Sequence, residues 1–260
     1  MKILSHDWQS NALNILKQMG CLVGPRLGAR TLSQALGVAL ATVCLWGGST
    51  SLSPATASTD MKALQNGLQK EPETLLIVGD SLSSEYGIRR GTGWVQLLRD
   101  KLSESDLGPV TIINASISGD TTSSGLTRLP TLLTKHEPSI VLIELGGNDA
   151  LRGLSLDMTR ANLDKMIDLS QAAGAQVIVA GMQIPPNYGP AYTKQFRDLF
   201  PDVAQENNAA LIPFFLAGLE MDRSLFIEDG IHPAEHAQSI LLDNVWPVLD
   251  PLLSGNDSAD

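Results

Sequence analysis

The sequence predicts an α/β fold in which a parallel five-stranded sheet is covered by helices on both faces, a three-layer α/β/α sandwich. Short apolar segments rich in Val and Ile alternate with longer segments whose apolar residues recur at helical spacing. The segments between expected strands are long enough to hold a helix, which parallel neighbouring strands require. With 260 residues, the chain suffices for one medium domain with an ample core.

The first half of the domain begins with a buried strand. Leu75 to Val78 is a continuous apolar run, and Gly79 ends it abruptly. A helix is expected over residues 94–102, then a strand over 110–114 and a short helix over 125–135 that Pro130 interrupts.

The second half repeats the alternation. Expected strands cover residues 139–145, 176–180 and 210–213, and expected helices cover 156–173, 192–207 and 233–249. Gly174 lies just past the end of the first of these helices, as a helix stop signal should. Pro201 is expected to kink or restart the second.

Residues 1–57 are predicted to be a secretory leader and not part of the fold. Four basic residues precede an apolar stretch of 12 residues at 35–46, and the Ala-x-Ala site Ala55-Thr56-Ala57 follows. The apolar stretch is short for a bilayer span. We therefore expect a protein exported to the periplasm, with a linker at 58–72, a folded domain at 73–252 and a disordered tail at 253–260.

The long basic part of this leader leaves its processing open. Met19 is an alternative start, which would shorten the basic part. Lipidation at Cys44 is a weaker alternative, because the bulky Val43 stands where a small residue is expected.

Charge and cysteine usage exclude several partners. The formal net charge is −10, and without residues 1–57 the chain keeps 14 basic and 27 acidic residues. This balance argues against nucleic acid or anionic lipid as the main partner. Both cysteines, Cys21 and Cys44, precede the domain, so it has no disulfide framework, cysteine-zinc site or cysteine nucleophile. Nothing in the pattern demands more than a monomer without stable membrane insertion.

Small and polar residues follow four of the expected strands. They are Gly79-Asp80-Ser81, the segment 114–120, Gly146-Gly147-Asn148-Asp149, and Asp229-Gly230-Ile231-His232-Pro233. Because parallel strands deliver their carboxyl ends to one sheet edge, we expect these loops to converge there.

The chemistry that these loops predict is acyl transfer. Ser81 is the candidate nucleophile, His232 its general base, and Asp229 the acceptor that fixes the imidazole tautomer. The candidate oxyanion donors are the backbone N–H groups of Ser81 and Gly119 and the side-chain amide of Asn148. One such donor is worth about 3–4 kcal/mol of barrier.

These four segments resemble the four sequence blocks of the SGNH (GDSL) hydrolases. The resemblance covers nearly all of residues 73–252 and is strongest to the bacterial periplasmic thioesterase I, arylesterase and lysophospholipase group. The segments that carry it are 114–121, 145–149, 151–154 and 184–189. It implies a flavodoxin-like sandwich and cofactor-free hydrolysis of acyl esters and thioesters. A carbohydrate O-acetyl esterase on the same scaffold is the alternative.

Two other classes of protein compete with this interpretation. His232-Pro233-Ala234-Glu235-His236 matches the H-x-x-E-H pattern of inverted zinc peptidases. That pattern needs one continuous helix, whereas Pro233 disfavours helical backbone at His232. A nucleotide-binding module is disfavoured because no phosphate-binding glycine motif follows the first strand. We therefore expect neither a metal nor another cofactor.

Several further residues have assigned roles. Asp80 and Asp149 are expected to hold loops, and Glu144 is expected to be a satisfied structural acid. Apolar loop residues flank the expected site and are predicted either to line an acyl pocket or to pack the loops together. The tentative substrate-binding set is Leu82, Tyr86, Leu151, Arg152, Ile184, Pro186 and Tyr188.

Overall fold

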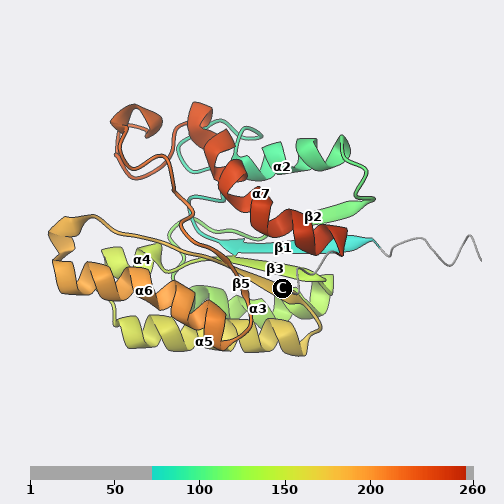
Figure 1. The fold of residues 1–260 in the computed structure, drawn as a ribbon, viewed down its shortest axis with the longest axis horizontal. Coiled ribbons are helices and arrows are strands. Elements are labelled where there is room, and N and C mark those ends of the chain that lie inside the picture. Colours follow the sequence, from blue (N-terminus) through green and yellow to red (C-terminus); the bar gives the residue numbers. More distant parts are fainter. Residues whose placement is uncertain (1–71, 256–260) are drawn as a thin grey trace, which may run out of the picture. The chain divides into compact units, whose positions relative to one another are not determined.

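The computed structural model describes residues 72–255, and their strands form a parallel five-stranded sheet (Figure 1). The strands are β1 (Glu73–Gly79), β2 (Val110–Asn114), β3 (Ile140–Glu144), β4 (Gln176–Ala180) and β5 (Ala210–Ile212). They lie in the order β2-β1-β3-β4-β5, and all neighbouring pairs are parallel. The order therefore reverses between β1 and β3, a point where open sheets of this kind bind ligands.

Helices cover both faces of this sheet. Helices α2 (Trp94–Ser103) and α7 (Gln238–Ser254) lie together on one face, while α3 (Thr122–His136), α5 (Leu156–Ala172) and α6 (Pro190–Glu206) lie on the other (Figure 1). A short helix, α4 (Gly147–Leu151), and the 3₁₀ turns η1 (Pro186–Tyr188), η2 (Arg223–Leu225) and η3 (Glu235–Ala237) belong to the loops. The predicted three-layer, flavodoxin-like α/β/α sandwich is confirmed.

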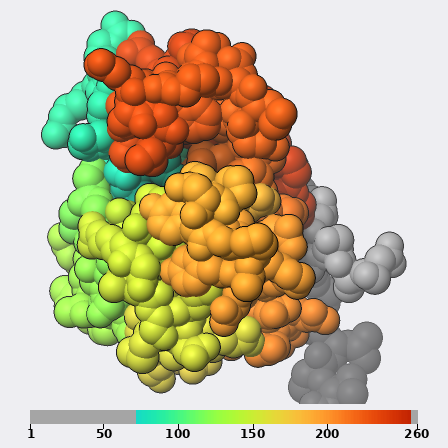
Figure 2. Space-filling model, turned by 90° about the vertical axis from the view of Figure 1, so that its left-hand side faces the viewer, coloured from blue at the N-terminus to red at the C-terminus, as the bar shows by residue number. Residues whose placement is uncertain are grey.

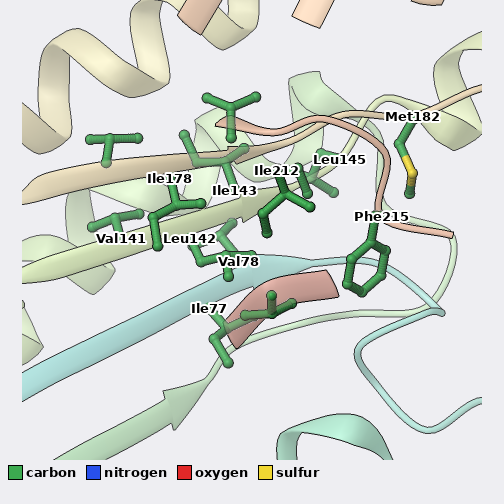
Figure 3. Packing of buried hydrophobic residues seen from close by; sticks show 14 of the residues in the cluster. Ile77, Val78, Val141, Leu142, Ile143, Leu145, Ile178, Met182, Ile212 and Phe215 are labelled. Atoms are coloured by element: carbon green, nitrogen blue, oxygen red, sulfur yellow. The ribbon is translucent and has the colours of Figure 1, made fainter. Parts of the chain in front are cut away.

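The core explains why the central strands are apolar on both sides. Leu75 to Val78 of β1 and Ile140 to Ile143 of β3 are at most 1% exposed, because helices cover both faces of each strand. Side chains of β1, β3, β4 and β5 meet with Phe215 in the layer shown in Figure 3. By contrast, the edge strand β2 is only half-buried.

Two helix predictions need correction at their prolines. The helix expected at 125–135 begins earlier, at Thr122, because the Thr121 hydroxyl caps it by accepting the Ser124 N–H. Pro130 and Pro201 do not interrupt α3 and α6. Both prolines are exposed, so water can satisfy the carbonyls that they leave without an N–H partner.

The closing helix and one loop also differ from expectation. Pro233 forms an isolated antiparallel bridge with Phe226, so α7 begins only at Gln238. It continues to Ser254, and its 1% exposed Leu253, which the sequence assigned to the tail, belongs to the core. Helix α4, which occupies five residues of a predicted loop, was not among the predicted helices.

The predicted leader (1–57), nearly all of the predicted linker and both cysteines lie outside the described residues. Between residues 72 and 255, no helix has both the length and the apolar character needed to cross a membrane.

Candidate active site

The loops that leave the carboxyl ends of the strands meet on one face of the domain. Figure 2 looks at this face and shows the segments after β1 in teal, after β2 in green, after β3 in yellow-green and after β5 in red-orange. Register explains the closest approach: Gly79, the last residue of β1, pairs with Glu144, the last residue of β3. The predicted convergence of these loops is thus observed.

Hydrogen bonds connect Asp229 to His232 and His232 to Ser81. The Ser81 Oγ lies 2.8 Å from His232 Nε2, and His232 Nδ1 lies 2.6 Å from Asp229 Oδ2. Ser81 lies in the turn after β1, whereas Asp229 and His232 lie in one loop before α7. Ser81 and His232 are 151 residues apart in the sequence. The imidazole is 16% exposed.

The loop of His232 is held by contacts that keep its geometry. Asp229 Oδ1 accepts the backbone N–H groups of Ile231 (2.9 Å) and His232 (3.0 Å). Partial burial opposes ionisation of Asp229, but these two N–H groups and the imidazole outweigh it and lower the carboxyl pKa to about 2. Asp229 is therefore ionised at neutral pH and can orient the imidazole.

Arg223 is a loop anchor that the sequence analysis missed. Its guanidinium donates to the carbonyls of Phe226 (3.2 Å), Ile227 (2.7 Å) and Glu228. It packs against Gly230, which has φ +72°. Arg223 thus holds the start of the Asp229 loop through hydrogen bonds to backbone carbonyls. No sequence motif predicts such contacts.

Two of the candidate oxyanion donors, Gly119 and Asn148, have different local environments. Gly119 has φ +82°, a left-handed conformation that favours glycine. The Asn148 Nδ2 atom donates to Asp80 Oδ2 (2.8 Å) and to the carbonyl of Asp120 (3.0 Å). An amide has two N–H bonds, so both are occupied in the free protein.

Asp80 and Asp149 hold loops as expected, whereas Glu144 differs from its expected role. Asp149 accepts the N–H (2.9 Å) and hydroxyl (2.6 Å) of Thr122 and so fixes the start of α3. Asp80 accepts the Leu82 N–H (3.1 Å) and the Asn148 amide, which connects the β1 and β3 loops. The expectation that Glu144 is a satisfied acid is only half right, because its buried Oε1 has no hydrogen-bond partner.

The tentative substrate-binding residues fall into different environments. Tyr86 is 50% exposed and its ring lies 4.5 Å from that of His232. Arg152 donates to the Gly119 carbonyl (2.9 Å), and the Tyr188 hydroxyl donates to the Leu151 carbonyl (3.4 Å).

The other three members of that set differ in burial. Ile184 is 7% exposed and belongs to the core, which fits the alternative that these loops pack on each other. Leu82 is half-buried against the core, and Pro186 is exposed.

The geometry around His232 does not fit a zinc-peptidase helix. His232 lies in a loop, Glu235 and His236 lie in η3, and α7 starts after them. The His232 Nε2 faces Ser81, and Glu235 pairs with Arg89 at 2.6 Å. No group of three or more metal-binding side chains occurs among residues 72–255.

A serine, a histidine and an aspartate joined by hydrogen bonds at the carboxyl edge of an open α/β sheet have the arrangement that serine hydrolases use for acyl transfer. Residues 77–240 match the GDSL-like Lipase/Acylhydrolase family. The chain belongs to this family, which confirms the resemblance to the SGNH (GDSL) hydrolases.

Individual relatives bear the same kind of name. The chain is 47% identical to "Esterase TesA" of Pseudomonas aeruginosa over 185 residues, which cover 71% of this chain and 92% of the relative. It is 40% identical to "Thioesterase 1/protease 1/lysophospholipase L1" of Escherichia coli over 182 residues, 70% of this chain and 86% of the relative. The prediction of a carboxylic ester hydrolase is therefore confirmed.

Solved structures agree with this assignment. The crystal structure of TesA matches with a TM-score of 0.66 and 48% identity, covering 69% of this chain and 99% of that chain. A psychrotrophic esterase, EstA from Pseudoalteromonas sp., in a form inhibited by monoethylphosphonate, matches with a TM-score of 0.65 and 41% identity, covering 70% and 98%.

Proposed function

We propose that the protein hydrolyses acyl esters and acyl thioesters by covalent catalysis at Ser81. The observation that carries this proposal is the unbroken hydrogen-bond sequence from Asp229 through His232 to Ser81, with contacts of 2.6 and 2.8 Å. Both distances lie within the reach that proton transfer requires.

The first half of the reaction forms an acyl-enzyme. Ser81 Oγ attacks the carbonyl carbon while His232 Nε2 takes the hydroxyl proton, and the carbonyl π electrons move onto oxygen. The tetrahedral intermediate collapses when the bond to the leaving group breaks. His232 then gives its proton to the leaving alcohol or thiol.

The second half of the reaction frees the enzyme. Water attacks the acyl carbon, His232 takes a proton from that water, and the acid leaves when Ser81 Oγ recovers the proton. Asp229 stays ionised throughout and stabilises the imidazolium. No step needs a metal or a cofactor.

The oxyanion of each intermediate needs donors. The backbone N–H groups of Ser81 and Gly119 and the amide of Asn148 are the proposed donors. Because the Asp120 carbonyl accepts one Asn148 N–H at 3.0 Å in the free protein, that N–H is the one that turns to the oxyanion. The contact with Asp80, at 2.8 Å, then keeps the amide oriented.

The substrate range follows from the relatives and from the rim of the site. The relatives are named as an esterase, an arylesterase and a thioesterase and lysophospholipase, so simple acyl esters with various leaving groups are the proposed substrates. The loops at residues 151–154 and 184–188, with Leu82 and Tyr86, are the proposed acyl contacts. We further propose that the protein acts in the periplasm as a monomer.

A substrate panel with a covalent probe tests this function. Acyl chains of increasing length, each with an oxygen and a sulfur leaving group, should be hydrolysed, and a phosphonofluoridate should label Ser81 with loss of activity. Ser81→Ala should abolish labelling, and EDTA should leave activity unchanged. Activity that zinc restores after chelation would contradict the serine mechanism, and preference for acetyl-xylan would favour the carbohydrate esterase alternative.

The proposed acyl contacts have a separate test. Alanine substitution of Leu151 and of Tyr188 should shift the chain-length preference of the enzyme, since shorter side chains would enlarge an acyl pocket. An unchanged preference would mean that these residues only pack the loops together.

A further inference from the structure

Two buried carboxyl groups lie directly behind the candidate nucleophile. Asp80 precedes Ser81 and is 3% exposed, and Glu144 at the end of β3 is 0% exposed. Glu144 Oε2 accepts the Asp80 N–H at 3.2 Å and the Ser83 hydroxyl at 2.7 Å. A Cβ on Gly79 would lie 2.6 Å from Oε2, so only glycine lets β1 approach this carboxyl so closely.

Within residues 72–255, no cation pairs with either carboxyl group to balance two negative charges. The titratable groups that face them are His232, near Asp80, and the ion pair of Arg128 with Asp120, in which Arg128 reaches the Gly79 carbonyl at 3.4 Å. Two buried carboxylates side by side would be strongly unfavourable, so the pair must retain a proton.

The hydrogen bonds indicate which acid carries that proton. Glu144 Oε1 receives no donor, whereas both Asp80 oxygens accept N–H groups, from Leu82 at 3.1 Å and from Asn148 at 2.8 Å. A carboxyl oxygen that already accepts a hydrogen bond is a poorer place for a hydrogen than one without a donor, so Glu144 Oε1 is the best place for it.

We propose that Glu144 acts as a neutral carboxylic acid that donates its proton to the Asp80 carboxylate and thereby positions both Ser81 and Asn148. Glu144 touches no reacting atom, so it is a positioning residue. It holds the Ser81 turn through the Asp80 N–H and Ser83. It holds Asn148 through the Asp80 carboxylate, which accepts the amide only while it is correctly oriented.

The electrostatics agree with this assignment. Burial raises the pKa of Glu144 well above its usual range, and the neighbouring charge of Asp80 raises it further. Burial also raises the pKa of Asp80, but the Leu82 N–H, His232 and Asn148 hold it to about 6. At neutral pH the proton therefore resides on Glu144, and Asp80 is the ionised partner.

A set of substitutions tests the location of the proton. Glu144→Ala should lower kcat about 10- to 100-fold with little change in KM, because the nucleophile and an oxyanion donor lose their support. Glu144→Gln should restore kcat to within about threefold of wild type, because the amide is neutral and its N–H replaces the donated proton. Asp80→Asn should lower kcat about tenfold or more, since it loses one acceptor. Glu220→Gln, on an exposed carboxyl, is the matched control.

The opposite pattern would overturn the proposal. If Asp80→Asn keeps its activity while Glu144→Gln loses it, the proton resides on Asp80. If both conservative variants behave like wild type, the pair does not position the site. The pH profile adds a second signature: kcat of the wild type should fall at alkaline pH as Glu144 ionises, and the Gln variant should lack this fall.

Carboxyl ¹³C NMR of the wild-type protein gives a readout that needs neither variants nor activity. One Glu carboxyl signal, assigned to Glu144, should stay at the shift of a protonated acid through neutral pH. A Glu144 signal that titrates near its ordinary range would refute the proposal. The kinetic arm rests on the proposed ester hydrolysis, but the NMR arm does not, so failure of one is distinguishable from failure of the other.

Discussion

Two aspartates flank the Ser81 and His232 pair, and they behave in opposite ways. Asp229 lies on the solvent side, with a side chain 34% exposed, and three hydrogen bonds lower its pKa to about 2. Asp80 lies on the core side, 3% exposed, and burial raises its pKa to about 6. An aspartate is thus ionised at all ordinary pH values on one side of the proposed nucleophile, Ser81, whereas the charge of the other depends on pH. The cause is that access to water and the supply of N–H donors differ.

The two sides also affect stability with opposite signs. The Asp229 pKa is lower in the folded chain than its ordinary 3.8, so its contribution to the unfolding free energy is present above pH 3.8 and is lost as pH falls toward 2. The Asp80 pKa is raised, so its contribution is present below pH 3.8 and is lost as pH rises through about 6. Ionisation of Asp229 therefore stabilises the fold on the solvent side of the site, and protonation of Asp80 stabilises it on the core side.

The largest expected effect comes from removing the Asp229 carboxylate, on the solvent side of the Ser81 and His232 pair. Asp229→Asn should lower kcat about 10³- to 10⁴-fold, because an amide favours the wrong imidazole tautomer. The unfolding free energy at pH 7 should fall only modestly, because the charge is lost but the amide oxygen can still accept the backbone N–H groups of Ile231 and His232. Steady-state kinetics and urea unfolding of the same preparation measure both. A kcat near that of wild type would show that Asp229 does not orient His232 during turnover.

The next effect is expected on the core side of the pair, at Asn148, the proposed oxyanion donor. Asn148→Ala should lower kcat about 10²- to 10³-fold, the loss typical of one oxyanion donor. KM should stay nearly constant, because the contact strengthens only in the transition state. If KM rises while kcat is retained, Asn148 binds substrate and does not stabilise the oxyanion.

The pH dependence of stability sharpens the comparison further. Glu144 keeps its proton when folded and loses it above about pH 4.5 when unfolded, so wild type should lose stability relative to Glu144→Gln as pH rises. The expected slope of the difference is about 1.4 kcal/mol per pH unit until the folded pKa is reached. Urea unfolding of both proteins at several pH values measures it. A difference independent of pH would mean that Glu144 ionises in the folded protein.

The smallest effect is expected from Tyr86, whose ring packs on the imidazole from the solvent side. Tyr86→Ala should change kcat about two- to fivefold, because this exposed ring contact is weak beside the Asp229 hydrogen bonds. Initial rates on short and long acyl esters test it. A change of a hundredfold or more would show that Tyr86 holds His232 in place, and a loss confined to long esters would assign it to the acyl contacts.

The sequence predicted what depends on local pattern. Continuous apolar strands, helix-length crossovers and the loop residues Ser81, Asn148 and His232 can be read directly, because each is a short-range signal. The predictions that failed concern helix boundaries, which depend on contacts with other parts of the chain. Pro130 was expected to interrupt a helix, but α3 continues through it, and Pro233 delays α7 because its segment pairs with Phe226.

The sequence by itself determined the α/β class, the apolar strands and the identity of the groups at the sheet edge. Only the tertiary structure decided which of those groups touch. The 2.8 Å contact between Ser81 and His232 and the burial of Glu144 against Asp80 both depend on strand order and register. Neither spacing nor composition encodes such contacts, because they join residues 151 and 64 positions apart through the packed sheet.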